Sequence, residues 1–296
     1  MSKSLKKLID IDRLREFKSK LNAQSILKRW PDGAEAHNAM WGGRDITAAF
    51  DAGTVSKHIA DGTFKDIFPG DYITKQVTIP QVLADDGATE LFAGGTYTVN
   101  WVIADCDYWI NKGDYGNGMV THHVVIVPQR SIFNAQMNTT NTTEGGYAGS
   151  RMYRETIPAC ATGIVNAFGS GHILTFRDSI TRAVNTSSIS SGAPFWTGAS
   201  SDWGWYDAQC NLMCERMVYG MPAFSSSAWD AGAATRQFSA FRLSGRLVNI
   251  RSTWWLRDVV SSAYFACADG MGTATVCVAV GASGAGEGVR PFALLK

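Results

Sequence analysis

The chain has 296 residues, which is long enough for one large domain or two ordinary ones. Its 27 lysines and arginines nearly balance its 26 aspartates and glutamates, and a net charge of +1 gives no basic excess for binding nucleic acid or an anionic membrane surface. Charged residues amount to 18%, against roughly 25% in typical soluble domains, and there are 30 glycines. This composition indicates a loop-rich β protein or a subunit partly covered by its neighbours.

The opening residues, MSKSLKKLIDIDRLREF, mix charges into the apolar positions, and no run of about 18 apolar residues follows. We therefore expect neither a secretory signal nor membrane insertion. The six cysteines match neither a CxxC pair nor a Cys/His zinc spacing, which predicts reduced thiols and synthesis in a cytoplasm. Cys210 and Cys214 are expected to be small buried residues on one helix.

Residues 4–22 carry leucines and a phenylalanine at three- and four-residue steps between lysines and arginines, which predicts an amphipathic helix. A polar connector follows it to residue 41. Two roles remain open for this N-terminal segment, residues 1–41: the helix packs on its own domain, or it is a docking or trimerising handle in an assembly. No heptad continues beyond the helix, so a long coiled coil is not expected.

The globular region begins with two short helices and two strands. The pattern predicts helices over residues 45–51, where Asp45 provides an N-cap, and over residues 53–60. Alternating β-branched and aromatic residues predict strands over residues 72–79 and 95–104.

Residues 119–128 (MVTHHVVIVP) are the clearest candidate for a buried strand. His122 and His123 are adjacent on it, so their side chains are expected on opposite faces. They then cannot chelate one metal ion together, and no cysteine or carboxylate stands at ligand spacing beside them. We predict hydrogen-bonded structural histidines and no metal site.

Loops and helices alternate in the second half of the chain. The predicted elements are a loop over residues 137–147, a helix over 150–168 interrupted near Pro158, a strand over 173–176, a Ser/Gly loop over 185–204, and a helix over 209–219. Long loops are often functional, and the one over residues 185–204 carries Trp196 and Trp203. Glu215, in the middle of the last helix, is expected to be solvated or paired.

The stretch from Thr253 to Lys296 has bulky ends and a middle of small side chains. It opens with Trp254-Trp255-Leu256-Arg257-Asp258 and closes with Gly288-Val289-Arg290-Pro291-Phe292. Each tryptophan can bury a large apolar area, and each arginine offers a planar fork to carbonyls or carboxylates. Gly288 permits a tight approach, and Pro291 is expected to stop further pairing. The contrast predicts a fixed frame around an adaptable surface.

Several longer strings carry a family resemblance. They are GGRDITAAFDAGTVSKHIADGTFKDIFPGDYI (42–73), ADCDYWINKGD (104–114), THHVVIVP (121–128), MNTTNTTEGGYAGSRM (137–152) and NLMCERMVYG (211–220) with FSSS (224–227). With WWLRD and GVRPF they resemble a family of virion proteins encoded by phages and prophages of gut bacteria. The resemblance covers roughly residues 42–296.

The terminal frame also resembles the C-type-lectin-like fold of phage tropism determinants, of other variable proteins of diversity-generating retroelements, and of formylglycine-generating enzymes. This second resemblance implies an α+β chain in which a β-rich part, residues 42–130, precedes a C-type-lectin-like domain, residues 131–296. The frame residues would be Trp254, Trp255, Arg257, Gly288, Arg290 and Pro291. The contact residues would be Ser261, Ser262, Tyr264, Ala266, Asp269, Met271, Thr273, Thr275 and Glu287.

The function that the resemblance implies is host-surface recognition by a virion protein. The chain would be a tail-fibre, baseplate or head-fibre component, made in the bacterial host cytoplasm, and its partners would be other virion proteins and a host receptor, protein or glycan. A homotrimer would add weak contacts into avidity. The alternative is a purely structural capsid-decoration or tail subunit, in which the terminal segment has no recognition role and packs on other virion proteins.

Catalysis is not expected. The sequence has no GxSxG elbow, no HExxH, no P-loop and no GxGxxG after a strand. The chemistry of formylglycine-generating enzymes relies on paired cysteines, and Cys267 and Cys277 do not match that motif. We therefore expect no enzyme activity and no cofactor.

Overall fold

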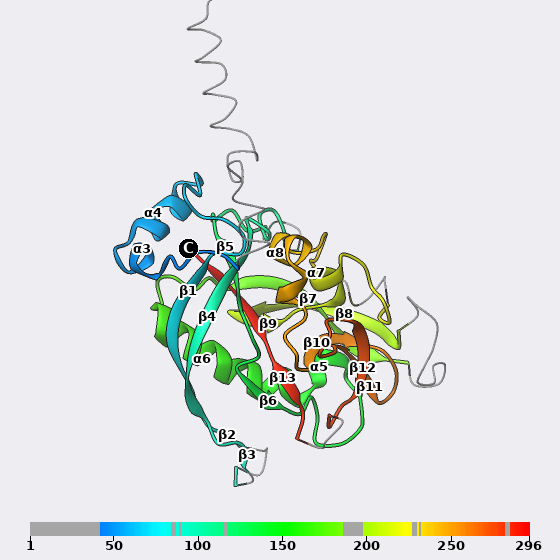
Figure 1. Cartoon of the computed structure of the whole chain (residues 1–296). Coiled ribbons are helices and arrows are strands. Elements are labelled where there is room, and N and C mark those ends of the chain that lie inside the picture. Colours follow the sequence, from blue (N-terminus) through cyan, green and yellow to red (C-terminus); the bar gives the residue numbers. More distant parts are fainter. Residues whose placement is uncertain are drawn as a thin grey trace, which may run out of the picture.

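The computed structural model describes residues 42–83, 87–88, 90–114, 116, 118–185, 198–226, 230, 232–281 and 285–296. The helix predicted over residues 4–22, its connector, and Trp196 lie outside the described residues. The described chain is α+β, as the sequence predicts, with two five-stranded sheets and mostly short helices (Figure 1).

The elements of the first half are α3 (Thr47–Asp51), α4 (Thr54–Ala60), β1 (Tyr72–Ile79), β2 (Val82–Leu83), β3 (Glu90–Phe92), β4 (Gly95–Cys106), β5 (Val124–Pro128), β6 (Phe133–Ala135), α5 (Gly146–Gly149), the π-helical turn η3 (Met152–Thr156) and α6 (Ile157–Phe168). The elements of the second half are β7 (Phe176–Val184), β8 (Ser200–Ala208), β9 (Cys210–Leu212), α7 (Glu215–Tyr219), α8 (Ser239–Leu243), the 3-10 turn η4 (Gly245–Leu247), β10 (Trp254–Val259), β11 (Tyr264–Ala268), β12 (Ala274–Val278), β13 (Glu287–Val289) and β14 (Pro291–Leu295).

The first sheet has the strand order β1-β4-β5-β14-β9, with antiparallel pairing throughout. Every residue of β5 and β14 is buried, because both faces of the sheet are covered. Successive residues of β5 belong alternately to two hydrophobic cores, one on each face. This double burial explains why β5 reads as an unbroken apolar run in the sequence.

The second sheet has the strand order β12-β11-β10-β13-β6. Its pairs are antiparallel except β10 with β13, which run parallel with Trp254 opposite Gly288. The two sheets are joined at Arg290, because β13 ends at Val289 in the second sheet and β14 begins at Pro291 in the first. In Figure 1 this connection is the red segment that runs from β13 into the middle of the first sheet.

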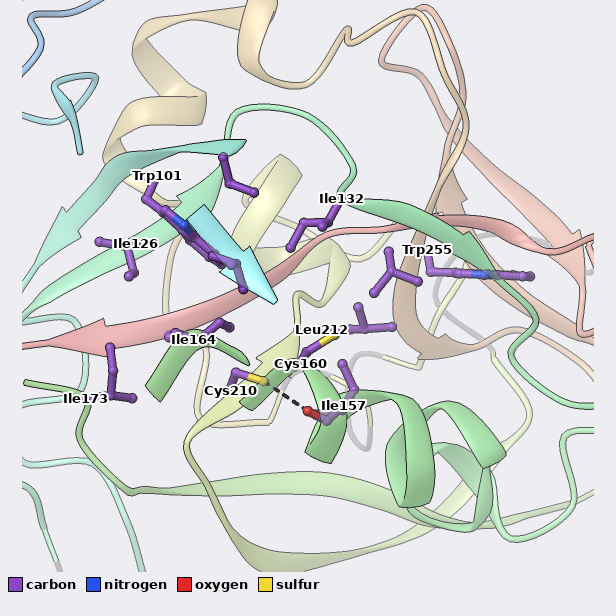
Figure 2. Close-up of a cluster of buried hydrophobic side chains, with 14 of the residues drawn as sticks. Trp101, Ile126, Ile132, Ile157, Cys160, Ile164, Ile173, Cys210, Leu212 and Trp255 are labelled. Atoms are coloured by element: carbon purple, nitrogen blue, oxygen red, sulfur yellow. Dashed lines mark hydrogen bonds between the residues drawn. The ribbon is translucent and has the colours of Figure 1, made fainter. Parts of the chain in front are cut away.

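The first core lies on one face of the first sheet and contains Trp101, Ile126, Ile164, Leu212 and Trp255 (Figure 2). In it the Cys210 thiol donates to the Ile157 carbonyl oxygen, with 3.4 Å between sulfur and oxygen. The second core lies on the other face and contains Trp109, Phe238, Trp254, Phe292 and Leu294.

Both cores and the first sheet draw on residues before and after the boundary expected at residue 130. Strands β1, β4 and β5 precede it, whereas β9 and β14 follow it. The division into parts 42–130 and 131–296 therefore does not separate two independent sheets or cores. The β-rich part supplies three strands to the same sheet that receives the end of the chain.

Several predicted elements differ in extent. The helix predicted over residues 209–219 is wrong, because β9 occupies its first residues and only α7 is helical. Cys210 and Cys214 are buried but do not share a helix. Tertiary pairing of β9 with β14 overrides the local helical pattern.

The strand predicted over residues 119–128 is shorter, since only β5 is regular strand. The helix predicted over residues 150–168 runs without a break from η3 into α6. Pro158 has no N–H to donate to the preceding turn, and that turn is the π-helical η3 in place of a regular α-helical one. The strand predicted over residues 173–176 contributes one bridge at Ile173, and β7 begins at Phe176.

Within the described parts of the chain, no helix combines the length and apolar character needed to cross a bilayer.

Candidate functional site

Strand β10 places two adjacent tryptophans in two different cores. Neighbouring side chains on a strand point to opposite faces, so Trp255 enters the first core and Trp254 the second. The Trp255 indole N–H donates to the Ala135 carbonyl oxygen at 2.7 Å. The Trp254 indole N–H donates to the Val248 carbonyl oxygen at 3.3 Å. The two indoles thus attach β10 to β6 on one side and to the segment after η4 on the other.

Arg290, at the crossing between the sheets, is completely buried. Its Nε donates to the Pro128 carbonyl oxygen and its Nη1 to the Leu247 carbonyl oxygen, both at 2.7 Å. Its guanidinium carbon lies 4.7 Å from the Trp254 ring centroid. Among the described residues no carboxylate pairs with it, and burial lowers the pKa of Arg290 to about 9. The side chain therefore holds β5, η4 and β10 together through carbonyl oxygens and an aromatic face.

Arg257 is also buried but has a carboxylate partner. Its Nη1 and Nη2 both donate to Asp178 on β7, the second at 3.3 Å. Asp178 further accepts a hydrogen bond from the Asn211 amide at 3.2 Å. Burial opposes the charge on Arg257, yet the Asp178 carboxylate outweighs it and keeps the pKa of Arg257 above its usual range. This pair joins β10 to the β7–β8 hairpin.

Three more carboxylates lie buried beside this pair. Glu215 accepts hydrogen bonds from the Ala223 N–H at 2.8 Å and the Ser225 hydroxyl at 2.6 Å, and its own N–H donates to Asp258 at 2.7 Å. Burial raises the pKa of Asp258 well above its usual range, and the neighbouring Glu215 and Asp230 carboxylates add to the rise. Burial likewise raises the pKa of Asp230 to about 6. Glu215 is therefore bonded inside the fold and not exposed on a helix.

The closing motif takes its shape from close packing. Gly288 is buried, and its N–H donates to the Thr253 carbonyl oxygen at 3.0 Å. Pro291 does not stop pairing: it opens β14, opposite Leu212 of β9. As the first residue of the strand it needs no N–H donor there.

The contact residues expected from the family resemblance lie on and around the hairpin formed by β11, residues 269–273 and β12. Ser262, Met271 and Thr273 are exposed, and Met271 is 76% exposed. Tyr264, Asp269, Thr275 and Glu287 are partly exposed. Ser261 and Ala266 are buried, at 1% and 0% exposure, so they do not offer a contact surface.

These residues do not share one face. Tyr264 packs against the second core, whereas Thr275 pairs with Cys267, which belongs to the first core. Glu287 lies on β13, separated from β11 by β10. The structure therefore gathers Asp269, Met271 and Thr273 at the hairpin tip and distributes the other positions along its flanks.

Asp269 shapes the tip. Its Oδ1 accepts hydrogen bonds from the Met271 N–H at 2.9 Å and the Thr273 N–H at 2.8 Å. A carboxylate that bonds two backbone donors of its own turn fixes that turn. Asp269 thus positions the exposed Met271 and Thr273 side chains.

The adjacent histidines His122 and His123 are hydrogen-bonded within the fold, as predicted. His122 Nδ1 lies 2.8 Å from Asp107 Oδ2, and the buried His123 accepts a hydrogen bond at Nε2 from the Trp109 N–H at 3.0 Å. In the described part of the chain, no group of three His, Cys, Asp or Glu side chains is arranged to hold a metal ion.

Comparison with known protein families, curated proteins and solved structures gives no match for this chain.

Sequence reasoning missed the buried carboxylates Glu215, Asp230 and Asp258. The only local signal is the Arg257-Asp258 dipeptide, because a charged pair inside an otherwise apolar strand requires buried partners. Glu215 and Asp230 come from distant segments, and only the tertiary fold brings them to β10.

Proposed function

We propose that this chain is a phage virion protein that displays a C-type-lectin-like domain for recognition of a host surface. The observation that supports the proposal is a set of fully buried side chains on β10 and at Arg290, next to a hairpin whose tip is exposed and begins where Trp254 pairs with Ala268. Trp254, Trp255, Arg257 and Arg290 are at most 2% exposed, whereas Met271 is 76% exposed. Such a division allows the tip residues to change without loss of the fold, as a recognition surface requires.

The chain acts, in this proposal, as a tail-fibre, baseplate or head-fibre component in the virion, with other virion proteins as partners. Few strong anchors are present at the hairpin tip, since Met271 is the one large apolar side chain there. Each copy therefore binds its receptor weakly, and multivalent display as a trimer supplies the avidity. The proposed contact surface is centred on Asp269, Met271 and Thr273 at the tip, and Ser262, Tyr264, Thr275 and Glu287 flank it on different faces.

The test is binding of purified protein to host cells and adsorption of phage that carry Tyr264→Ala or Met271→Ala. Met271→Ala removes an exposed side chain, so the fold should persist and adsorption should fall. Tyr264 also packs against the second core, so its variant is first checked for retained folding and should then show the same fall in adsorption. The matched control is Met221→Ala, since Met221 is 51% exposed and lies outside the hairpin. Normal adsorption by both hairpin variants, with no binding of the purified protein, would contradict the proposal.

A second candidate function is purely structural, and the position of β12 favours it. Strand β12 is an edge strand of the second sheet as far as the chain is described, and a sheet edge is a site where another chain can pair. In that case the hairpin packs on a neighbouring virion protein. A virion reconstruction with residues 260–287 buried against another subunit would support this function over recognition.

A further inference from the structure

A polar cleft of about 920 Å³ lies beside the hairpin tip, between three segments that are far apart in the sequence. One wall comes from β1 and β4, with Tyr72 and Asn100. A second comes from Gln129 and Arg130 after β5, and the third from residues 244–251. Met271 of the hairpin tip stands at its edge. The volume is close to the upper end of the roughly 300–1,000 Å³ typical of small-molecule sites.

The described charged side chains that line the cleft are all positive. Arg130, Arg246 and Arg251 line it, and none of the described lining residues is acidic. Arg130 and Arg251 are exposed, and neither has an ion pair within the described residues. In a chain of net charge +1, three arginines around one cleft are a local excess of positive charge. Arginine forks bind carboxylate and sulfate oxygens in a bidentate manner, so the cleft suits an anion.

The remaining lining groups suit hydroxyl groups. The Asn100 amide donates to Gln129 Oε1 at 3.1 Å, and both side chains are partly exposed at the cleft. Asn249 is exposed on the opposite wall. Amide side chains offer both donors and acceptors, as sugar hydroxyls do. Three cations and a small cavity are too few for a nucleic acid, whose binding needs a longer row of phosphate contacts.

The walls are held in place from inside the fold. The buried Arg290 donates to the Leu247 carbonyl oxygen of one wall at 2.7 Å and to the Gln129 carbonyl oxygen of another at 3.4 Å. Arg251 has a φ of 60°, a left-handed conformation that is uncommon for a residue with a side chain. The tight turn at Gly272, where a Cβ atom would stand 2.9 Å from the Asn249 nitrogen, presses the hairpin against the third wall. The cleft is therefore preformed, which lowers the entropic cost of binding.

We propose that this cleft binds an acidic oligosaccharide, with Arg130 and Arg251 on its carboxylate or sulfate groups and Asn100, Gln129 and Asn249 on its hydroxyls. The site goes beyond the proposed function, because the residues proposed to bind the ligand lie outside the hairpin, and Met271 is the one described lining residue that belongs to the tip. A cleft of this size takes several sugar rings, whereas a single inorganic anion leaves most of it empty.

The test is calorimetric titration of the purified full chain with three tetrasaccharides: tetragalacturonate, a chondroitin sulfate tetrasaccharide and neutral maltotetraose. The expected result is binding of at least one acidic chain and at least about tenfold weaker binding of maltotetraose. The two acidic probes distinguish carboxylate from sulfate recognition. Failure of both acidic chains to bind, or equal binding of maltotetraose, would overturn the proposal.

Two substitutions locate the site. Arg130→Gln removes the charge and keeps a polar side chain, and Arg251→Asn removes the charge with a residue that tolerates the left-handed backbone. Each substitution should lower the affinity for the acidic tetrasaccharide about tenfold. The matched control Arg154→Gln changes an exposed arginine on η3, outside the cleft, and should change nothing. A variant that carries both substitutions and still binds the tetrasaccharide as tightly as the parent would contradict the assignment. Inorganic phosphate that binds as tightly as the tetrasaccharide would contradict it too.

The outcome is separable from that of the proposed function. Tyr264→Ala lies outside the cleft and should leave tetrasaccharide binding intact even where it reduces phage adsorption. Loss of adsorption with intact tetrasaccharide binding supports both sites. Intact tetrasaccharide binding with normal adsorption of the hairpin variants contradicts the hairpin surface alone.

Discussion

Gly288 lies so close to Ser131 that a Cβ atom at position 288 would stand 2.1 Å from the Ser131 hydroxyl oxygen. It would also stand 3.0 Å from the Thr253 carbonyl oxygen. The close approach lets β13 lie parallel to β10 while it pairs with β6.

We predict that Gly288→Ala lowers the free energy of unfolding by about 1–3 kcal/mol, because a methyl group must displace packed atoms. Chemical denaturation measures the change. Adding Ser131→Gly should recover part of the loss, since it removes the nearest obstructing atoms. Gly171→Ala is the control, because a Cβ atom there meets nothing within 4 Å. Equal effects of the two alanine substitutions would contradict the packing argument.

The buried pair of Arg257 and Asp178 leads to a second prediction. Asp178→Asn should lower the free energy of unfolding by about 3–5 kcal/mol, because it leaves a buried guanidinium without a charged partner. Asp202→Asn is the matched control, since it breaks the exposed pair with Arg182 and should cost less than about 1 kcal/mol. Urea denaturation measures both variants. Equal losses of unfolding free energy in the two would show that burial of the ion pair does not determine the cost of breaking it.

Arg290 leads to a third prediction. Arg290→Lys keeps a positive charge but loses the planar fork that reaches Pro128 and Leu247 together. We expect a loss of about 2–4 kcal/mol in unfolding free energy, since hydrogen bonds to a charged donor are worth about 1.5–3 kcal/mol each. Arg242→Lys, at an exposed position of α8, should be neutral. A stable Arg290→Lys protein would mean that charge alone is sufficient at this position.

Lys112 leads to a prediction about pH. Its Nζ is buried, has no hydrogen-bond partner among the described residues, and lies 3.5 Å from the Tyr108 ring centroid. Burial, with a smaller contribution from Arg236, lowers the pKa of Lys112 from 10.5 to about 7. The unfolded chain therefore binds more protons than the folded one between these two values, so this group makes the protein more stable as the pH rises through that window.

Lys112→Met removes the penalty of burying the charge. We expect it to raise the unfolding free energy by about 1–2 kcal/mol below pH 7, and the gain should shrink as the pH approaches about 10. Denaturation curves for both proteins across this range check it. Lys57→Met, at an exposed position, should stay within about 0.5 kcal/mol of the parent at every pH. If the stabilisation by Lys112→Met increased with pH, it would contradict a lowered pKa of Lys112 in the folded protein.

The sequence by itself determined the strongly patterned elements. Strand β5 was predictable because five consecutive apolar residues are typical of a strand buried on both faces. Trp254 and Trp255 were recognisable as bulky groups at the start of the terminal stretch, and adjacent positions on a strand place them on opposite faces. The mixed α+β class followed from the same local patterns.

Only the tertiary structure decided the rest. The segment at Cys210 became strand β9 because its pairing with β14 outweighs a local helical preference. Pro291 begins a strand because the chain changes sheets at Arg290, and nothing local in GVRPF specifies that change. Arg130, Arg246 and Arg251 meet around one cleft, and the segments that carry them are separated by more than a hundred residues. Such sites depend on contacts between distant segments, whereas local pattern records only which faces of each element are apolar.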